Sequence, residues 1–200
     1  MTGLGVLICG FSAGMFDYSM FGMDPFQVFA HGAWMKTPLS YGTFYLLLSL
    51  VMLVLVFFMD KRKIGIATFI NLLFLGYVVD FSSKLWGRWF PEPGTAFRFG
   101  ILLLAIILMC LGSALYYVGD LGVSVYDAVA ITVSEKKKWD FRIVRIVCDV
   151  ICTLTGFLLG ATVGIGTLIT AFCMGPLIAF FKRTVAIPML EGRRPAAGKR

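Results

Sequence analysis

Six apolar stretches, each about long enough to cross a lipid bilayer, constrain the fold of this chain more than any other feature. They span residues 4–22, 41–59, 64–81, 99–119, 141–160 and 161–181 and contain few or no charged side chains. A helix needs about 20 such residues to cross about 30 Å of hydrocarbon. Because unpaired backbone groups are costly in lipid, these stretches are expected to be helical. The sequence therefore predicts an all-α membrane protein with six transmembrane helices.

The basic charge of the chain, +7 overall, is distributed so as to orient these spans. With the N-terminus in the cytoplasm, the cytoplasmic segments carry thirteen Lys and Arg residues and the opposite segments carry four. The positive-inside rule requires such an excess when both termini are cytoplasmic. We therefore predict a multi-pass protein of the bacterial inner membrane, surrounded by lipid and without a nucleic-acid partner.

The two halves of the chain resemble each other in sequence. A shift of 100 residues places "GMDPFQVF" (22–29) on "GVSVYDAV" (122–129). A shift of 99 places "IGIATFINLLFLGYVVDF" (64–81) on "VGIGTLITAFCMGPLIAF" (163–180). Several glycine and threonine positions coincide, which a shared apolar alphabet alone does not explain. The pattern indicates an internal repeat.

Each predicted copy contains three spans, so the second copy would enter the membrane from the opposite side. The predicted organisation is a first three-helix repeat over residues 1–85, a linker over 86–98, a second inverted repeat over 99–183 and a basic cytoplasmic tail over 184–200. Inverted repeats are common among secondary transporters, where the two copies open a central site alternately to each side.

Each copy also contains a short apolar stretch after its first span, at residues 25–35 and 123–133. Eleven residues cannot cross the bilayer, so both stretches are predicted to be re-entrant or interfacial half-helices. Asp24 before Pro25 predicts a helix start there, and Ser124 could cap the second half-helix. Broken helices near a repeat interface often hold the ligand of a transporter.

One pair of ionisable residues lies within a predicted span, where such groups are costly to bury and are usually paired or functional. Arg145 and Asp149 are four residues apart, on one helical face and close enough to pair. One interpretation is a structural ion pair that holds this span to its neighbours. The other is that Arg145 attracts an anionic group of a substrate while Asp149 positions it or takes a proton. The equivalent residues of the first copy are Tyr45 and Ser49, so the pair breaks the repeat symmetry.

The half-helices carry further polar candidates. Asp127 and its equivalent Gln27 either hydrogen-bond the backbone of a re-entrant turn or line a site between the repeats. Asp24 is either a solvated interface residue or part of the same site. The remaining candidate substrate-binding residues are Thr68, its equivalent Thr167, and Asn71.

The glycines before Thr167 admit two interpretations. Gly164 and Gly166 do not fit a phosphate-binding loop, because position 169 is isoleucine and no Lys follows the last glycine. They are better explained as positions where backbones approach closely, with the Thr167 hydroxyl bonded within its own helix or to a neighbour. The alternative is that Thr68 and Thr167 meet near the repeat axis and contact a ligand.

No residue pattern predicts catalysis or a metal. The five cysteines fall in apolar segments, and one histidine in the whole chain offers no metal-ligand cluster. No nucleophile can be paired with a base, so an enzyme is not expected and no cofactor is predicted.

The chain resembles the YczE/YitT-type bacterial integral membrane proteins from about residue 5 to 183. The resemblance is carried, in order, by "GMDPFQVFAHG" (22–32), "LGVSVYDAV" (121–129), "RIVRIVCD" (142–149) and "ATVGIGTLITAFCMGP" (161–176). It implies an acidic residue at Asp127 and a basic and an acidic one at Arg145 and Asp149. It also implies small-molecule export as an expected activity.

The leading functional prediction is a small secondary transporter or exporter of an organic or amphipathic molecule, working by alternating access. The alternatives are a non-transport scaffold or accessory subunit, and a passive channel. Coupling to a proton or sodium ion and assembly as a homo-oligomer are left open by the sequence.

Overall fold

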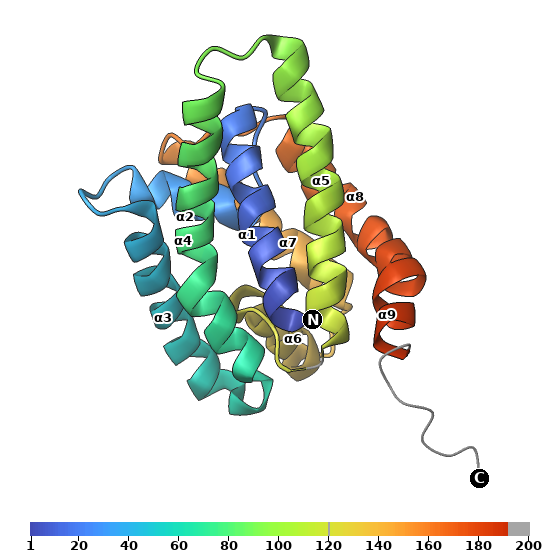
Figure 1. The fold of residues 1–200 in the computed structure, drawn as a ribbon. Coiled ribbons are helices and arrows are strands. Elements are labelled where there is room, and N and C mark those ends of the chain that lie inside the picture. The colour runs from blue at the N-terminus through green and yellow to red at the C-terminus, as the bar shows by residue number, and fades with distance from the viewer. Residues whose placement is uncertain (120, 192–200) are drawn as a thin grey trace.

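The chain folds into helices joined by short loops in a computed structural model that describes residues 1–119 and 121–191. The helices of the first half are α1 (Thr2–Ser19), α2 (Pro25–Trp34), α3 (Tyr41–Asp60) and α4 (Ile66–Trp89), with a 3-10 turn at Lys61–Lys63. Those of the second half are α5 (Thr95–Val118), α6 (Val125–Lys137), α7 (Phe141–Leu158), α8 (Ile165–Phe181) and, after a π turn at Lys182–Ala186, α9 (Ile187–Glu191) (Figure 1). The predicted all-α fold class is confirmed.

Four helices are long and apolar enough to cross a membrane. They cover Tyr41–Lys63, Ile66–Trp89, Thr95–Val118 and Ile165–Leu190, and they match four of the six predicted spans. The other two predicted spans, 4–22 and 141–160, are the 18-residue helices α1 and α7, which do not meet that description. Helix α7 carries three charged residues, Arg142, Arg145 and Asp149, and α1 is rich in glycine and serine where it packs against α4 and α5.

The two predicted half-helices are short helices with the predicted caps. Helix α2 has 10 residues and α6 has 13, so each is about 15–20 Å long and too short to span the bilayer. The Asp24 carboxylate accepts a hydrogen bond from the Phe26 backbone N–H at 3.2 Å, and Pro25 is the first helical residue. The Ser124 hydroxyl accepts from the Asp127 N–H at 3.1 Å.

Several predicted boundaries shift. Helix α4 continues to Trp89 and α5 begins at Thr95, so the loop between the halves covers 90–94 and is shorter than the predicted linker. Pro91 explains where α4 stops, since the residue before a proline disfavours helix. The predicted tail over 184–200 begins in helix as far as Glu191, and residues 192–200 lie outside the described part.

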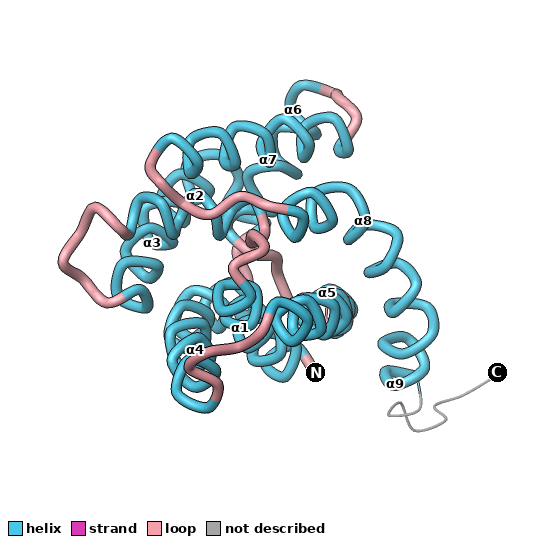
Figure 2. The backbone as a smooth tube through the Cα atoms, turned by 90° about the horizontal axis from the view of Figure 1, so that it is seen from above, coloured by secondary structure: helices cyan, strands magenta, loops and turns pink. Residues whose placement is uncertain are grey.

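Helix α1 occupies the centre of the molecule, between α4 and α5 (Figures 1 and 2). Small residues allow this close packing. A Cβ atom added at Gly5 would lie 2.7 Å from the Gly112 carbonyl oxygen of α5, and one added at Gly14 would lie 2.5 Å from the Ser82 Cβ of α4. Close approach of backbones at small residues is the usual means of helix association in membranes.

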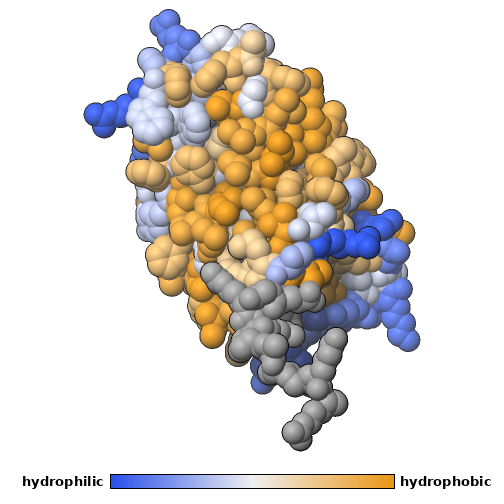
Figure 3. Space-filling view, turned by 45° about the vertical axis from the view of Figure 1, so that its right-hand side comes forward, coloured by the Kyte–Doolittle hydropathy of each residue, from blue (hydrophilic) through white to orange (hydrophobic). Residues whose placement is uncertain are grey.

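The outer surface is dominated by apolar side chains. Phe58 and Leu158 are 81% and 83% exposed, and many other large apolar side chains point outward. Figure 3 shows a broad hydrophobic face with hydrophilic residues gathered toward two opposite ends of the molecule. Exposed apolar side chains are unfavourable in water but stable against lipid tails. The fold is therefore that of a multi-pass membrane protein.

The two halves make the same contact with each other twice, with the roles exchanged. The Phe21 carbonyl, in the loop after α1, accepts a hydrogen bond from the Gly166 N–H at the start of α8 at 2.8 Å. The Leu121 carbonyl, in the loop after α5, accepts from the Ala67 N–H at the start of α4 at 3.0 Å. The loop after α1 therefore packs against the N-terminus of α8, and the loop after α5 packs against the N-terminus of α4.

Glycine is required at these contacts. Gly22 and Gly122 have φ values of 101° and 108°, which other residues rarely adopt. A Cβ atom added at Gly164 would lie 2.3 Å from the Phe21 carbonyl oxygen, and one at Gly166 would lie 2.7 Å from the Gly22 carbonyl oxygen. Close approach at Gly164 and Gly166 is confirmed, with the difference that their partner is a loop rather than a helix.

Candidate functional site

A cavity of about 1150 Å³ lies between the halves, bordered by helices α1 to α8. Its size is at or above the upper range of small-molecule sites. Six of the eight predicted substrate-binding residues line it: Asp24, Gln27, Asn71, Asp127, Arg145 and Asp149. The structure thus brings together residues that are up to 125 positions apart in the sequence.

Thr68 and Thr167 do not line the cavity. The Thr68 hydroxyl donates to the Val123 carbonyl at 2.7 Å and accepts from the Gly65 N–H at 3.2 Å. Thr167 sits at the equivalent helix start, where its hydroxyl accepts from the Gly164 N–H at 3.5 Å. Both side chains are almost completely buried. They hold the helix starts on which the loops of the other half pack, and the structure does not bring them to the cavity with the other six candidates.

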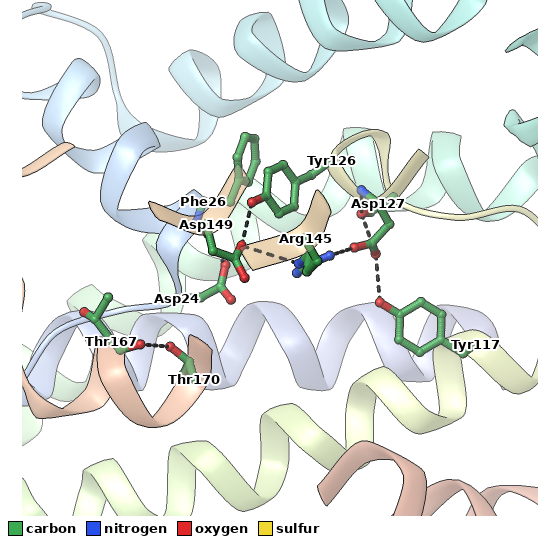
Figure 4. A network of polar contacts seen from close by, with 10 residues as sticks. Asp24, Phe26, Tyr117, Tyr126, Asp127, Arg145, Asp149, Thr167 and Thr170 are labelled. Carbon is green, nitrogen blue, oxygen red and sulfur yellow. Dashed lines mark hydrogen bonds and ion pairs between the residues drawn. The ribbon is translucent and has the colours of Figure 1, made fainter. Parts of the chain in front are cut away.

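The guanidinium of Arg145 lies between two carboxylates (Figure 4). Its Nη1 donates a hydrogen bond to Asp127 Oδ1, and its Nε lies 3.4 Å from Asp149 Oδ1. The pairing of Arg145 with Asp149 matches the prediction, and Asp127 of α6 joins it. Because both carboxylates already neutralise the guanidinium, Arg145 is poorly placed to attract an anionic substrate.

Asp127 is held by three side chains. Besides Arg145, the Ser124 hydroxyl and the Tyr117 hydroxyl each donate to Asp127 Oδ2 at 2.8 Å. The carboxylate is 7% exposed, and these donors offset the loss of its hydration. Asp127 therefore fixes α5, α6 and α7 relative to one another.

Tyr126 forms the floor of the site. Its hydroxyl donates to Asp149 Oδ1 at 2.6 Å, and the Arg145 Cζ lies 4.6 Å from the centre of its ring, within cation–π range. The other partner of the ring is Phe26, stacked at 4.7 Å between centroids with planes 21° apart. Phe26 and Tyr126 are aligned in the predicted repeat, and the structure stacks their two rings on each other.

The corresponding place in the first half is neutral. Gln27, equivalent to Asp127, accepts a hydrogen bond from the Tyr41 hydroxyl. Tyr45, equivalent to Arg145, makes an edge contact with the Phe26 ring at 6.0 Å, which parallels Arg145 over Tyr126. The same scaffold therefore carries aromatic and amide groups in one half and an ionised network in the other.

The two halves also differ in how tightly their last helix packs. A Cβ atom added at Gly76 of α4 would lie 2.8 Å from the Tyr45 Cβ, whereas nothing lies within 4 Å of one added at the equivalent Gly175 of α8. Helix α4 packs along α1 and α3, while α8 diverges from α5 and scarcely contacts α7 (Figure 2). The cavity occupies the space left by α8, where Gly175 and Pro176 line it.

The deep lining of the cavity is acidic and aromatic. Deep in the cavity three carboxylates, Asp24, Asp127 and Asp149, face one guanidinium, and tyrosine and phenylalanine rings form much of the wall. Among the described residues, no group of three or more His, Cys, Asp and Glu side chains is placed to hold a metal ion.

These features define a multi-pass helical membrane protein with a charged cavity between its two halves. The chain belongs to the family described as "Family of unknown function (DUF6198)", which matches residues 1–183. It is similar to an "Uncharacterized protein" of Haemophilus influenzae, 27% identical over 179 residues that cover 90% of this chain and 80% of the relative. It is also similar to the "Uncharacterized membrane protein YczE" of Bacillus subtilis, 22% identical over 199 residues that cover 98% and 91% of the two chains.

The predicted resemblance to YczE-type membrane proteins is confirmed by these matches. No solved structure is detectably similar to the chain. Inference about its activity therefore depends on the geometry of the cavity and of the two halves.

Proposed function

We propose that this protein is a secondary transporter that moves a small organic or amphipathic molecule across the bacterial inner membrane by alternating access. The observation that carries the proposal is the difference between equivalent helix contacts in the two halves. Around Gly76 the first half is closed, with Tyr45 packed against α4, and around Gly175 the second half is open onto the cavity.

An inverted repeat would explain how this difference between the halves produces alternating access. If the halves have nearly the same fold in opposite orientations, each can adopt the conformation of the other. The exchange would bring α8 against Arg145 and move α4 away from Tyr45. The cavity would then close on its present side and open on the other side of the membrane.

Two sets of contacts support the inverted-repeat interpretation. The loops after α1 and α5 seat on α8 and α4 by matching hydrogen bonds, from Gly166 and Ala67 respectively. In addition, each short helix packs on a long helix of the other half, α2 on α7 and α6 on α3. At the first of these crossings, a Cβ atom added at Gly156 would lie 2.5 Å from the Val28 carbonyl oxygen.

The proposed orientation places the open side in the cytoplasm. Glu135 near the end of α6 and Arg142 at the start of α7 line the open side, next to the α6–α7 connection that the charge distribution assigns to the cytoplasm. Asp24 and Asp149 are the carboxylates through which a proton or sodium gradient could act, because each can exchange a bound cation for a proton.

Matched pairs of introduced cysteines test the proposal in membranes, after the five native cysteines are replaced. The first pair is Gly42→Cys with Tyr77→Cys, where a Cβ atom at Gly42 would lie 2.6 Å from the Tyr77 ring. The second is Arg142→Cys with Pro176→Cys, the equivalent positions, which both line the open cavity.

Alternating access predicts that both pairs form disulfides under mild oxidation, because the protein visits both states. It also predicts that locking the second pair slows formation of the first. A static scaffold or accessory subunit keeps positions 142 and 176 apart, so failure of the second pair to cross-link would refute the proposal.

A further inference from the structure

We propose that the cavity selects an organic cation, an ammonium or guanidinium group attached to an aromatic or aliphatic body. This inference rests on the proposed transport function and names the chemistry of its substrate. It follows from the charge of the lining, from the aromatic wall and from one hydroxyl that lacks a partner.

The charge of the deep lining is the first reason. Arg145 is neutralised at close range by Asp127, whose own oxygens are occupied by Tyr117 and Ser124. Asp149 and Asp24 then remain as carboxylates in excess over the single guanidinium. Glu135 and Arg142 at the rim offset one another in formal charge. An anionic ligand would meet uncompensated carboxylates, whereas a cation would neutralise one of them.

The aromatic wall is the second reason. Among the described residues, seven aromatic rings line the cavity, those of Phe26, Tyr45, Tyr116, Tyr117, Tyr126, Phe141 and Phe172. Ring faces attract ammonium and guanidinium groups, and the attraction grows where water is excluded. The guanidinium of Arg145, 4.6 Å from the centre of the Tyr126 ring, shows that this wall already holds one cation.

The third and independent reason is Tyr116. Its side chain is 5% exposed and lines the cavity, yet its hydroxyl oxygen has no hydrogen-bond partner within the described residues. A buried hydroxyl without a partner is costly, so such groups usually meet a ligand or water. The oxygen itself is screened from solvent, so an ammonium N–H would reach it once the Tyr116 side chain turns its hydroxyl into the cavity.

A matched series of ligands tests the inference by isothermal titration of the purified full-length protein in detergent. The probes are tryptamine, its neutral analogue tryptophol and the carboxylate indole-3-propionate, which share one ring system and differ in charge. Tryptamine is expected to bind at least about tenfold more tightly than either analogue.

Two asparagine variants of helix-capping aspartates give the matched control. Asp24→Asn removes the charge but keeps the cap, because Asn caps a helix as well as Asp does. It is expected to weaken tryptamine binding by about tenfold or more. Asp140→Asn makes the same change at the exposed cap of α7, outside the cavity lining, and is expected to change nothing. Asp149→Asn serves as a second charge-removing variant.

The outcomes separate this inference from the proposed function. Preferential binding of the carboxylate, equal binding of all three probes, or binding of none overturns the cation inference and leaves the transport proposal to the cysteine pairs. Tryptamine binding without cross-linking of positions 142 and 176 overturns the transport proposal and leaves the cation site. Tryptamine preference that survives in both Asp24→Asn and Asp149→Asn also overturns the inference.

Discussion

Alanine at the two equivalent glycines, Gly76 and Gly175, should have opposite effects on the conformational equilibrium. In the described state a methyl group at Gly76 would lie 2.8 Å from the Tyr45 Cβ and 3.1 Å from the Gly42 carbonyl oxygen, both of which are close to rigid backbone. Overpacking of this kind costs about 1–3 kcal/mol. A methyl group at Gly175 meets nothing within 4 Å and costs nothing in this state.

The proposed exchange of conformations reverses this relation. In the opposite state α8 would pack on Arg145 as α4 now packs on Tyr45, so Gly175→Ala would carry the cost of about 1–3 kcal/mol there instead. A change of that size alters the ratio of the two states by about 5- to 150-fold. Gly76→Ala should therefore favour the opposite state, and Gly175→Ala should favour the described one.

The assay is the rate of disulfide formation between Arg142→Cys and Pro176→Cys in native membranes. We expect the rate to rise in the Gly76→Ala background and to fall by about fivefold or more in the Gly175→Ala background. Thermal unfolding in detergent provides the control for general damage. Equal effects of the two substitutions, or a fall in rate for both, would refute the reasoning from repeat symmetry.

Three further predictions concern stabilising contacts and are tested by denaturant or thermal unfolding in detergent. Arg145→Ala should destabilise the protein by about 2–4 kcal/mol because it leaves Asp127 buried without its counter-charge, and adding Asp127→Asn should recover part of that loss. Gly122→Ala should cost more than Gly160→Ala, because both positions have positive φ but only Gly122 has backbone within 3 Å of the added methyl group. Tyr117→Phe should cost about 1–3 kcal/mol through the lost hydrogen bond to Asp127, with no change in overall helicity by circular dichroism.

The sequence was sufficient to predict the short helices and several of the charged and polar residues that line the cavity. Asp24 with Pro25 and the cap at Ser124 are local signals, and the structure places the helix starts there. Arg145 and Asp149 were recognised because charges inside apolar helices are rare and need partners. Because they are four residues apart on one helix, their pairing could also be predicted from the local sequence.

The rest of the site depends on contacts that no local pattern specifies. Tyr116, Tyr117 and Tyr126 are aromatic residues in an aromatic-rich chain, and only the packing of α5 and α6 shows that they face the cavity. One signal was available, the alignment of Tyr126 with Phe26 in the repeat, which anticipates two rings at a shared interface. The place of Thr68 outside the cavity could not be predicted, because its hydroxyl donates to a loop of the other half, a contact between distant segments.

Only the second half carries the Arg145–Asp127–Asp149 network at the equivalent position. Under the proposed function, this difference in charge would prevent the protein from changing conformation without a bound ligand. Closing α8 over the open side would remove water from Arg145, Asp127 and Asp149, which are now at the cavity wall. Burying a charged group is costly unless the group is paired, and the carboxylates of this network outnumber its single guanidinium. A bound cation would supply the missing positive charge and lower the cost of closure.

Closure of α8 should consequently depend on the ligand. A ligand shifts the equilibrium between the open and closed states by the difference in its affinity for them. Tryptamine at saturating concentration is expected to accelerate disulfide formation between Arg142→Cys and Pro176→Cys, and tryptophol is not. Neutralising the excess charge by Asp149→Asn should raise the rate without ligand and reduce its response to tryptamine. If tryptamine binds but leaves the rate unchanged, the charge of the network does not control closure, and the coupling would have to lie in the neutral half around Tyr45 and Gly76.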